Sequence, residues 1–254
     1  MKAGRKEKIE SLLRLSHELG RPDRSMAILG EGNTSARLTD DRFLVKASGS
    51  SLSVLRRPDI VECKASILLQ LLQRGRATDS AIESALLASR VDSRSKKPSV
   101  EALFHAFCLS LPEIEYVGHT HAIAVNQILC SPRAKEFAEK RIFPDEIVCC
   151  GRASVLVPYT DPGFLLAKRI RLRTNAFIRT YRLIPRVILV ENHGILTLGR
   201  SPEAVLAAML MAEKAALIWL GAAAHGGPTF LSKRDVDRIA ERSDEHYRQR
   251  ALNI

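Results

Sequence analysis

The sequence predicts a mixed α/β protein, because two hydrophobic patterns alternate along its 254 residues. Short apolar runs, such as residues 43–45 and 187–190, are typical of strands. Longer segments, such as residues 5–20 and 79–90, repeat their apolar residues with the period of a helix. Hydrophobic residues make up 46% of the chain, enough for a sizeable core. The length fits one large domain or two small ones.

The helices and strands expected from these patterns follow one another along the whole chain. Ser99 and Ser201 are good N-caps, and Pro202 suits the first position of a helix. The expected helices cover residues 5–20, 64–74, 79–90, 99–110, 122–129, 164–182 and 232–250, with a short one from Ser131 and the longest from Ser201. The expected strands and extended segments cover residues 43–45, 58–63, 148–150, 155–157, 187–190 and 195–198.

The charge of the chain favours an anionic partner. Lys and Arg number 39 against 28 Asp and Glu, a formal net charge of +11. Such an excess suits phosphorylated metabolites, nucleic acid or an acidic surface. No nucleic-acid motif is recognisable, and aromatic residues are only 5% of the chain, so surfaces for base stacking are scarce. We therefore expect a phosphorylated or carboxylated small molecule. The basic helix at 164–182 has either a solvated or a subunit-contacting face.

Cysteine usage and the first residues indicate a soluble, cytoplasmic protein. The five cysteines are odd in number, lack Cys-x-x-Cys spacing and mostly lie in apolar runs. This is typical of reduced, buried thiols inside the cell. Residues 1–10 contain no apolar signal core, and we recognise no uninterrupted apolar run of 18 residues, so no membrane association is expected.

Two histidines separated by one residue, His119 and His121, are the strongest chemical signal. On a helix they would point about 200° apart, whereas on a strand both side chains lie on the same face. The preceding Ile114, Tyr116 and Val117 favour a strand. The pair therefore predicts half of a tetrahedral zinc site.

His193 is the natural third ligand. It precedes a glycine at the tip between the apolar strands 187–190 and 195–198, which would hold its imidazole rigidly and exposed. By itself it could equally be a structural histidine. The two histidines already expected at the end of a strand favour the metal interpretation.

Two loops of small residues can bind an anion through amides and hydroxyls. The first, 29–38, contains Gly-x-Gly, but Ser35 replaces the third glycine of a dinucleotide loop and no helix follows, which excludes that motif. An ordinary hairpin connection is the alternative. The second loop contains Ser48 and Gly49. Lys46 before it either adds positive charge or is a solvated strand residue.

Glu101 and His105 share one face of the helix that Ser99 opens. Glu101 lies in the first turn, where a carboxylate complements the helix dipole without any further role. His105 is open to three interpretations: a ligand, a partner of Glu101, or a satisfied, partly buried histidine.

Five segments together resemble the class II aldolases of the fuculose-phosphate aldolase and adducin group. They occur in the order and spacing of that family and span roughly residues 5–220. They are Gly32-Asn33-Thr34-Ser35, Ala47-Ser48-Gly49, Pro98-Ser99-Val100-Glu101, His119-Thr120-His121-Ala122 and Asn192-His193-Gly194. The run Pro-Tyr-Thr-Asp-Pro-Gly at 158–163 also resembles aldolase domains of the rhamnulose-phosphate type.

This resemblance implies a single domain over residues 1–254, with a three-layer α/β/α fold and a mostly antiparallel central sheet flanked by helices. It implies a homotetramer with active sites between subunits. Zinc, or another divalent metal, would bind His119, His121 and His193, and Glu101 would be the fourth, labile ligand and the catalytic acid and base. The substrate anion would lie near Asn33, Thr34, Ser48, Gly49 and Ser99.

The chain departs from the family pattern at two points. Some phosphate aldolases of this group carry a second serine where this chain has Val100, so one hydroxyl contact to a phosphate is missing. The tyrosine that donates a proton in the fuculose enzyme has no clear counterpart after His121. Tyr159 and Tyr247 are available but cannot be placed by sequence.

These residues suit the cleavage or formation of a C–C bond in a ketose phosphate or a related hydroxy-keto acid, through a metal-stabilised enediolate. Decarboxylases and 4-epimerases of the same family are the near alternative. A non-catalytic, adducin-like binding module would be expected to lack the three histidines. A basic nucleic-acid binder would bind without metal and with strong salt dependence.

Overall fold

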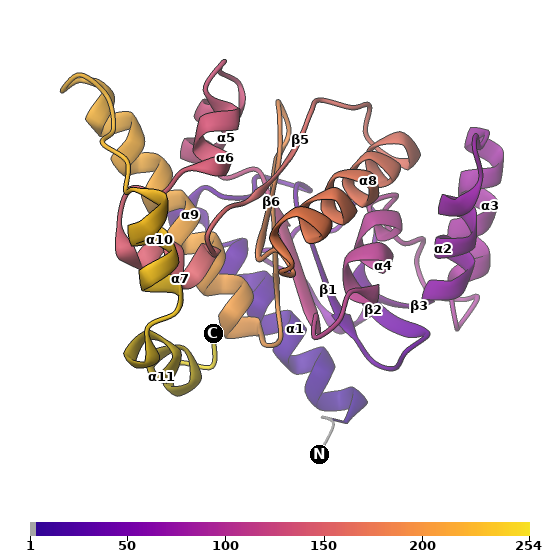
Figure 1. Cartoon of the computed structure of the whole chain (residues 1–254). Helices are drawn as coiled ribbons and strands as arrows, with labels where there is room; N and C mark the ends of the chain where they lie inside the picture. The colour runs from indigo at the N-terminus through magenta and orange to yellow at the C-terminus, as the bar shows by residue number, and fades with distance from the viewer. Residues whose placement is uncertain (1–3) are drawn as a thin grey trace.

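A seven-stranded sheet is the middle layer of the molecule (Figure 1). The computed structural model describes residues 4–254. The strands are β1 (Asn33–Arg37), β2 (Arg42–Lys46), β3 (Ile60–Lys64), β4 (Tyr116–Thr120), β5 (Val155–Val157), β6 (Val187–Val190) and β7 (Gly194–Gly199). Their order across the sheet is β3-β2-β1-β4-β7-β6-β5, and every neighbouring pair is antiparallel except β5 and β6.

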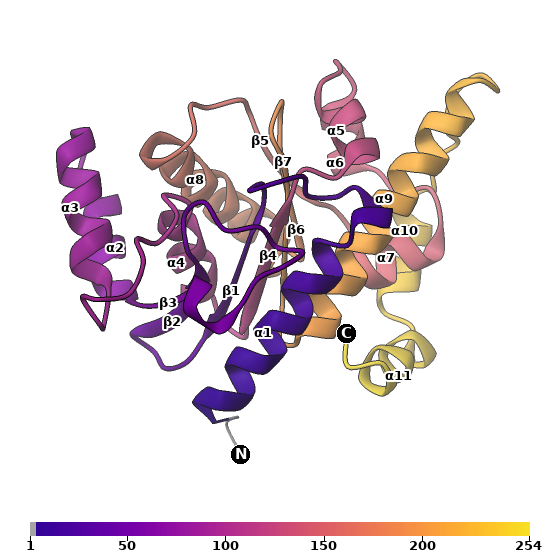
Figure 2. The same ribbon diagram turned by 180° about the vertical axis from the view of Figure 1, so that it is seen from behind.

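Helices cover both faces of this sheet, which confirms the predicted three-layer fold (Figures 1 and 2). One face packs against α2 (Ala65–Gln73), α3 (Asp79–Ser89), α4 (Ala102–Ser110) and α8 (Phe164–Tyr181). The other packs against α1 (Arg5–Leu19), α5 (Ile123–Leu129), α6 (Ala134–Glu139), α7 (Pro144–Cys150) and α9 (Pro202–Ala223). Two more helices, α10 (Lys233–Ala240) and α11 (Ser243–Ala251), follow, and short 3-10 turns lie at Pro22–Arg24 and Arg57–Asp59.

Alternating side chains of the strands supply the two hydrophobic cores. On β2, Phe43 and Val45 are buried toward α4, whereas Leu44 is buried toward α1. On β6, Ile188 is buried on the α4 side of the sheet and Leu189 on the α1 side. Successive side chains of a strand point to opposite faces, so a sheet covered on both sides needs apolar residues at every position. This explains the continuous apolar run at residues 187–190.

Helix α9 is, within residues 4–254, the one helix long and apolar enough to cross a membrane by length and composition alone. Its Val205, Met209 and Ala216 are buried in the core on the α1 side of the sheet. Packing against β4 and β7 therefore accounts for much of its apolar composition.

Three expectations about secondary structure were wrong. Residues 148–150 end helix α7 and are not a strand, because Pro144 and the acidic side chains after it start a helix that Gly151 ends at φ 83°. Residues 33–37 form strand β1, although the sequence indicated a loop throughout 29–38. The expected final helix at 232–250 is two helices, separated at Glu241 and Arg242.

Candidate metal centre

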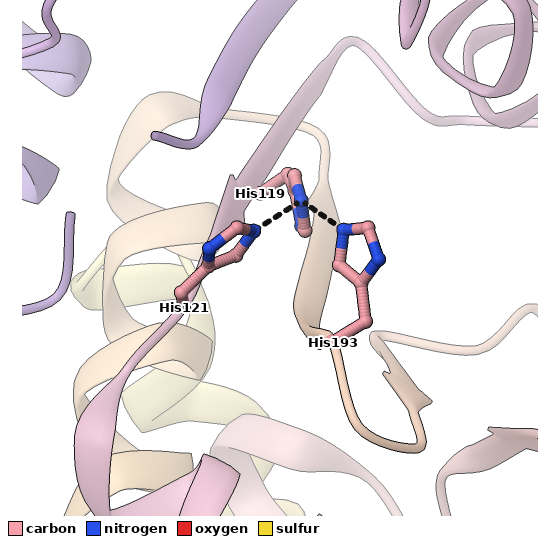
Figure 3. A group of neighbouring side chains, drawn as sticks. All are labelled: His119, His121 and His193. Atoms are coloured by element: carbon pink, nitrogen blue, oxygen red, sulfur yellow. Dashed lines mark hydrogen bonds between the residues drawn. The ribbon is translucent and has the colours of Figure 1, made fainter. Parts of the chain in front are cut away.

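Three histidines meet at one end of the sheet (Figure 3). His119 lies near the end of β4, His121 directly follows that strand, and His193 lies in the turn between β6 and β7. The Nε2 atom of His119 is 3.3 Å from Nε2 of His121 and 3.3 Å from Nε2 of His193. The antiparallel pairing of β4 with β7 brings residues 74 positions apart into one cluster.

The backbone fixes the orientation of the His119 ring. The side chain is fully buried, and Nδ1 lies 3.0 Å from the carbonyl oxygen of Ile195, to which it donates a hydrogen bond when protonated. In the neutral ring, that proton leaves the lone pair on Nε2, which points at the other two histidines. Metal-binding histidines are commonly oriented in this way.

His121 and His193 are held by groups outside the cluster. The Nδ1 atom of His121 is 3.7 Å from a carboxylate oxygen of Glu31. The side-chain amide of Asn126 donates a hydrogen bond of 3.0 Å to the carbonyl oxygen of His193. Burial and the neighbouring His119 lower the pKa of both rings, that of His193 to about 4. Both imidazoles are therefore neutral at pH 7, the form in which they bind metals.

Gly194 allows the turn to approach the other histidines. A Cβ atom at this position would lie 2.4 Å from the carbonyl oxygen of Thr120 and 2.9 Å from Cδ2 of His121. Real Cβ contacts essentially never fall below 3.0 Å, so any larger residue would force the turn away. The glycine after His193 thus has a steric function beyond ending a turn.

Glu101 completes the set of possible ligands. Its Oε1 atom is 3.3 Å from Nε2 of His119, and its side chain is 19% exposed. Burial alone would raise the pKa of Glu101, but attraction and a hydrogen bond from His119 hold it well below its usual range. Burial lowers the pKa of His119, whereas the charge of Glu101 and its hydrogen bond raise it. The net effect is a raised pKa. The backbone amide of Glu101 donates to Oγ of Ser99, 3.3 Å away.

Asn33, Ser48, Gly49 and Ser99 lie in segments around these groups. Asn33 pairs with His119 across β1 and β4. Within residues 4–254 neither atom of its buried side-chain amide forms a hydrogen bond of good geometry, although the amide is near enough to Glu101 to help lower the pKa of that carboxyl. A bridge between Ala47 and Pro98 holds the Ser48–Gly49 loop beside Ser99. Gly49 has φ 73° and open space where a side chain would stand. An unpaired buried amide is costly unless a ligand or water satisfies it.

Lys46 joins the two small-residue loops. Its ammonium donates to the carbonyl oxygens of Gly30, at 3.0 Å, and Ser50, at 2.7 Å. The residue is only 2% exposed, so the solvated strand position considered from the sequence is wrong. Burial lowers the pKa of Lys46, while the negative charge of Glu101 raises it. A buried positive charge thus supports both loops.

His105 is a buried neighbour rather than part of the histidine cluster. Its Nδ1 atom is 2.7 Å from Oγ of Ser35, and its ring stacks on Phe104 with centroids 5.0 Å apart. Burial lowers the pKa of His105 to about 3. Within residues 4–254, the histidines that lie close enough to share a metal are therefore His119, His121 and His193.

Thr34 does not belong with the other small residues. Its side-chain oxygen lies 2.6 Å from that of Ser16 on α1, so it faces the opposite side of the sheet from Ser35. Of the two tyrosines, Tyr247 lies on α11, away from the histidines. Tyr159 follows β5, which runs parallel to β6 and so ends on the histidine side of the sheet. Its side chain is 59% exposed.

The donor set fits a catalytic divalent metal. Three imidazole nitrogens converge, and a carboxylate oxygen lies next to them. Catalytic zinc sites combine three protein ligands with one exchangeable position. The sequence had indicated this set, but Glu31, Asn126 and the steric role of Gly194 could be seen only in the fold.

Comparison with known proteins agrees with the fold and shows the family. The model of the family described as class II aldolase and adducin N-terminal domain matches residues 10–220. The chain belongs to this family, whose members typically use a divalent metal.

Two curated relatives show how varied the family is. The protein named uncharacterized oxidoreductase YuxG, from Bacillus subtilis, is 31% identical over 205 residues, or 77% of this chain. This chain matches only 27% of the length of YuxG. A Haemophilus influenzae protein named 3-oxo-tetronate 4-phosphate decarboxylase is 26% identical, over 72% of this chain and 74% of that protein.

Solved structures share the fold. The class II aldolase domain of a Thermoplasma acidophilum protein has a TM-score of 0.68 at 24% identity, covering 87% of this chain and 97% of that one. An L-fuculose 1-phosphate aldolase has a TM-score of 0.68 at 17% identity, covering 94% and 96%.

Proposed function

We propose that the protein is a zinc-dependent lyase that cleaves or forms a C–C bond in a ketose phosphate or a related hydroxy-keto acid. The observation that carries this proposal is the convergence of three imidazoles beside the carboxylate of Glu101. The Nε2 atoms of His121 and His193 each lie 3.3 Å from Nε2 of His119. Family membership and the name of the fuculose-phosphate aldolase support the reaction class.

In this proposal the metal supplies a Lewis acid for the negative charge that develops on the substrate during C–C cleavage. Glu101 moves the proton. Burial would raise its pKa, but His119 outweighs that effect, so the carboxylate is ionised at neutral pH and is free to accept a proton from a substrate hydroxyl. When substrate separates it from that positive environment, the basicity of Glu101 rises.

The two loops and Asn33 bind the anionic end of the substrate. The amides of the loop at Ser48 and Gly49 and the hydroxyl of Ser99 provide donors, and the buried ammonium of Lys46 supplies positive charge beneath them. The unpaired amide of Asn33 gains its partner on the same substrate. Anchoring at this end positions the bond to be broken beside Glu101.

Decarboxylation is the second candidate. The Haemophilus influenzae relative that carries the name of a decarboxylase is matched over most of its length, unlike YuxG. The same metal and the same carboxylate would serve that reaction, because it also develops an enediolate-type charge. The two reactions differ in product, since one releases an aldehyde and the other carbon dioxide.

The test combines metal analysis with a product screen. Purified protein is expected to contain about one zinc per chain and to release aldehyde from at least one ketose phosphate. His119→Ala should lose metal and activity together, whereas the exposed His225→Ala should keep both. Carbon dioxide without aldehyde would select the decarboxylase. Full activity in His119→Ala would overturn the proposal.

The homotetramer with intersubunit active sites and the cytoplasmic location are further parts of the proposal. Helix α8 offers a suitable contact face, because Leu165 and Leu172 are each 55% exposed among its arginines. Light scattering coupled to size exclusion should give four chains per particle. A Leu165→Glu/Leu172→Glu variant should give smaller particles if α8 is the contact.

A further inference from the structure

A second cavity lies at the end of the sheet opposite the histidines. Its volume is about 750 Å³, and it is bounded by α7, the end of α8 and the helices α10 and α11. The start of β4 and the end of β7 adjoin it, whereas the opposite ends of these strands carry the histidines. Five residues of β4, at about 3.3–3.4 Å each, separate the two places by roughly 17 Å. In Figure 1, α11 lies at the lower end of the sheet and the β6–β7 turn at the upper end.

The lining of this cavity is rich in arginine. Five arginines line it against two glutamates and the carboxyl-terminal residue, Ile254. Glu113 forms an ion pair with Arg200, and Glu245 pairs with Arg248, which lies outside the lining. The lining arginines are Arg152, Arg182, Arg186, Arg200 and Arg250.

Three of these arginines have no carboxylate partner within residues 4–254. Arg152 is neutralised by Asp237 and Glu241, at 2.8 and 2.9 Å. No salt bridge is formed by Arg182, Arg186 or Arg250 in that part of the chain. The cavity therefore presents positive charge that the described side chains leave uncompensated.

Arg186 shows the imbalance best. It lies at the start of β6, and its guanidinium donates only to backbone carbonyl oxygens, those of Val148 at 2.5 Å and Cys149 at 3.5 Å. Burial lowers its pKa, as does the nearby Arg200, and this outweighs the opposite effect of Cys149 and Cys150. The other deeply placed arginine, Arg141, has the carboxylate of Glu146 3.7 Å away. A desolvated cation without a carboxylate is costly, and a bound anion removes that cost.

The rest of the lining is apolar. Phe177 stacks on Tyr181 with ring centroids 4.4 Å apart, and Ile184 and Leu198 are beside them. Tyr181 remains 41% exposed. A ligand that matches both halves carries a phosphate and an apolar or aromatic body. Inorganic phosphate would satisfy the arginines but leave the aromatic surface uncovered.

Helix α11 covers this cavity through polar contacts. It has no buried residue of its own. The side-chain amide of Gln249 donates a hydrogen bond of 2.8 Å to the carbonyl oxygen of Val148, and Arg248 forms an ion pair with Asp145 at 2.9 Å. A helix with so little apolar packing opens easily, so its amide exchange reports on what binds beneath it.

We propose that this cavity binds a small organic phosphate with an apolar or aromatic body, at a site separate from the metal centre. The phosphate interacts with Arg182, Arg186 and Arg250, and the organic part lies against Phe177 and Tyr181. The site does not depend on the proposed lyase activity, because none of its residues belongs to the histidine end of the sheet.

Hydrogen exchange measured by mass spectrometry tests this site directly. Phenyl phosphate is the probe, added to the full-length, metal-loaded protein at low ionic strength, where charge contacts are least screened. Peptides covering residues 177–186 and 243–254 should exchange at least about threefold more slowly with the probe. Arg182→Gln/Arg250→Gln should remove this protection and weaken phenyl phosphate binding by about tenfold or more.

A matched control separates the site from general charge effects. Arg234→Gln/Arg238→Gln also removes two positive charges, but from exposed positions of α10 outside the lining. This variant should keep the protection of residues 177–186 and 243–254. Slower exchange only in residues 28–35 and 46–54 would place the probe at the metal centre and overturn the proposal. Equal loss in both double variants would overturn it too.

Discussion

Replacing Gly194 by alanine should damage the metal centre although no candidate ligand is changed. The added Cβ would lie 2.4 Å from the carbonyl oxygen of Thr120, 2.9 Å from Cδ2 of His121 and 3.2 Å from Cε1 of His119. Two of these neighbours belong to the histidines themselves. The third is backbone, which cannot rotate aside as a flexible side chain would.

The displacement can be worked from these distances. To raise the contact with Thr120 from 2.4 Å to the 3.0 Å limit, the turn must move by about 0.6 Å. Metal–ligand distances tolerate only about 0.2 Å, so His193 would leave its bonding position. We expect zinc affinity to fall by about 10–100-fold, as for other changes that misplace a ligand. The overpacking should also lower the free energy of unfolding by about 1–3 kcal/mol.

Competition with a zinc chelator measures the affinity, and thermal unfolding of the metal-free protein measures the stability. Gly75→Ala is the control, because its Cβ would meet nothing within 4 Å and it lies far from the histidines, between α2 and α3. Unchanged zinc affinity in Gly194→Ala would refute the steric role of this glycine and the geometry of the turn.

Three further predictions concern the groups around the histidines. Glu101→Gln should retain zinc but lower kcat by about 10²–10⁴-fold, because the proton acceptor is lost; turnover at the wild-type rate would remove Glu101 from the mechanism. Lys46→Met should raise KM for a phosphorylated substrate, because the positive charge beneath the loops is lost. It should also lower the free energy of unfolding by about 1–3 kcal/mol, because the carbonyl oxygens in both loops lose their donor. An unchanged KM would argue against an anion site there. The pKa of His105 is depressed to about 3, below the 6.5 of an unperturbed histidine, so the unfolded chain binds this proton more readily. The stability that neutral His105 provides is therefore full above pH 6.5 and is lost as pH falls toward 3. Denaturant unfolding between pH 5 and 7 should show a shallower pH dependence in His105→Gln, and parallel curves would contradict this assignment.

The sequence predicted those parts of the fold in which hydrophobicity decides the structure. Strands β2, β6 and β7 were expected because their apolar runs are buried on both faces. Strand β1 was not, because Asn33, Thr34 and Ser35 are polar and show no strand pattern. Thr34 and Ser35 can be buried because side chains of other elements, Ser16 and His105, satisfy their hydroxyls.

The same distinction applies to the site. His119 and His121 could be selected because their spacing on a strand restricts where they point. The ligand role of Glu101 came only from the family resemblance, since a carboxylate in a first helical turn needs no further explanation. Lys46 could not be separated from a solvated lysine, since its burial depends on two loops that fold over it. The direction of the Thr34 side chain could not be predicted, because neighbours on a strand face opposite sides and the strand itself was not recognised. Local sequence carries no signal for such long-range contacts.

X-ray absorption at the zinc edge of the purified, zinc-loaded protein tests the central claim most directly. Three imidazole nitrogens at about 2.0–2.1 Å, with one or two oxygens completing the shell, are the expected result. His193→Ala should lose one nitrogen from that shell or fail to hold zinc. Sulfur ligands at about 2.3 Å, or a spectrum that His193→Ala leaves unchanged, would contradict a metal centre built from His119, His121 and His193.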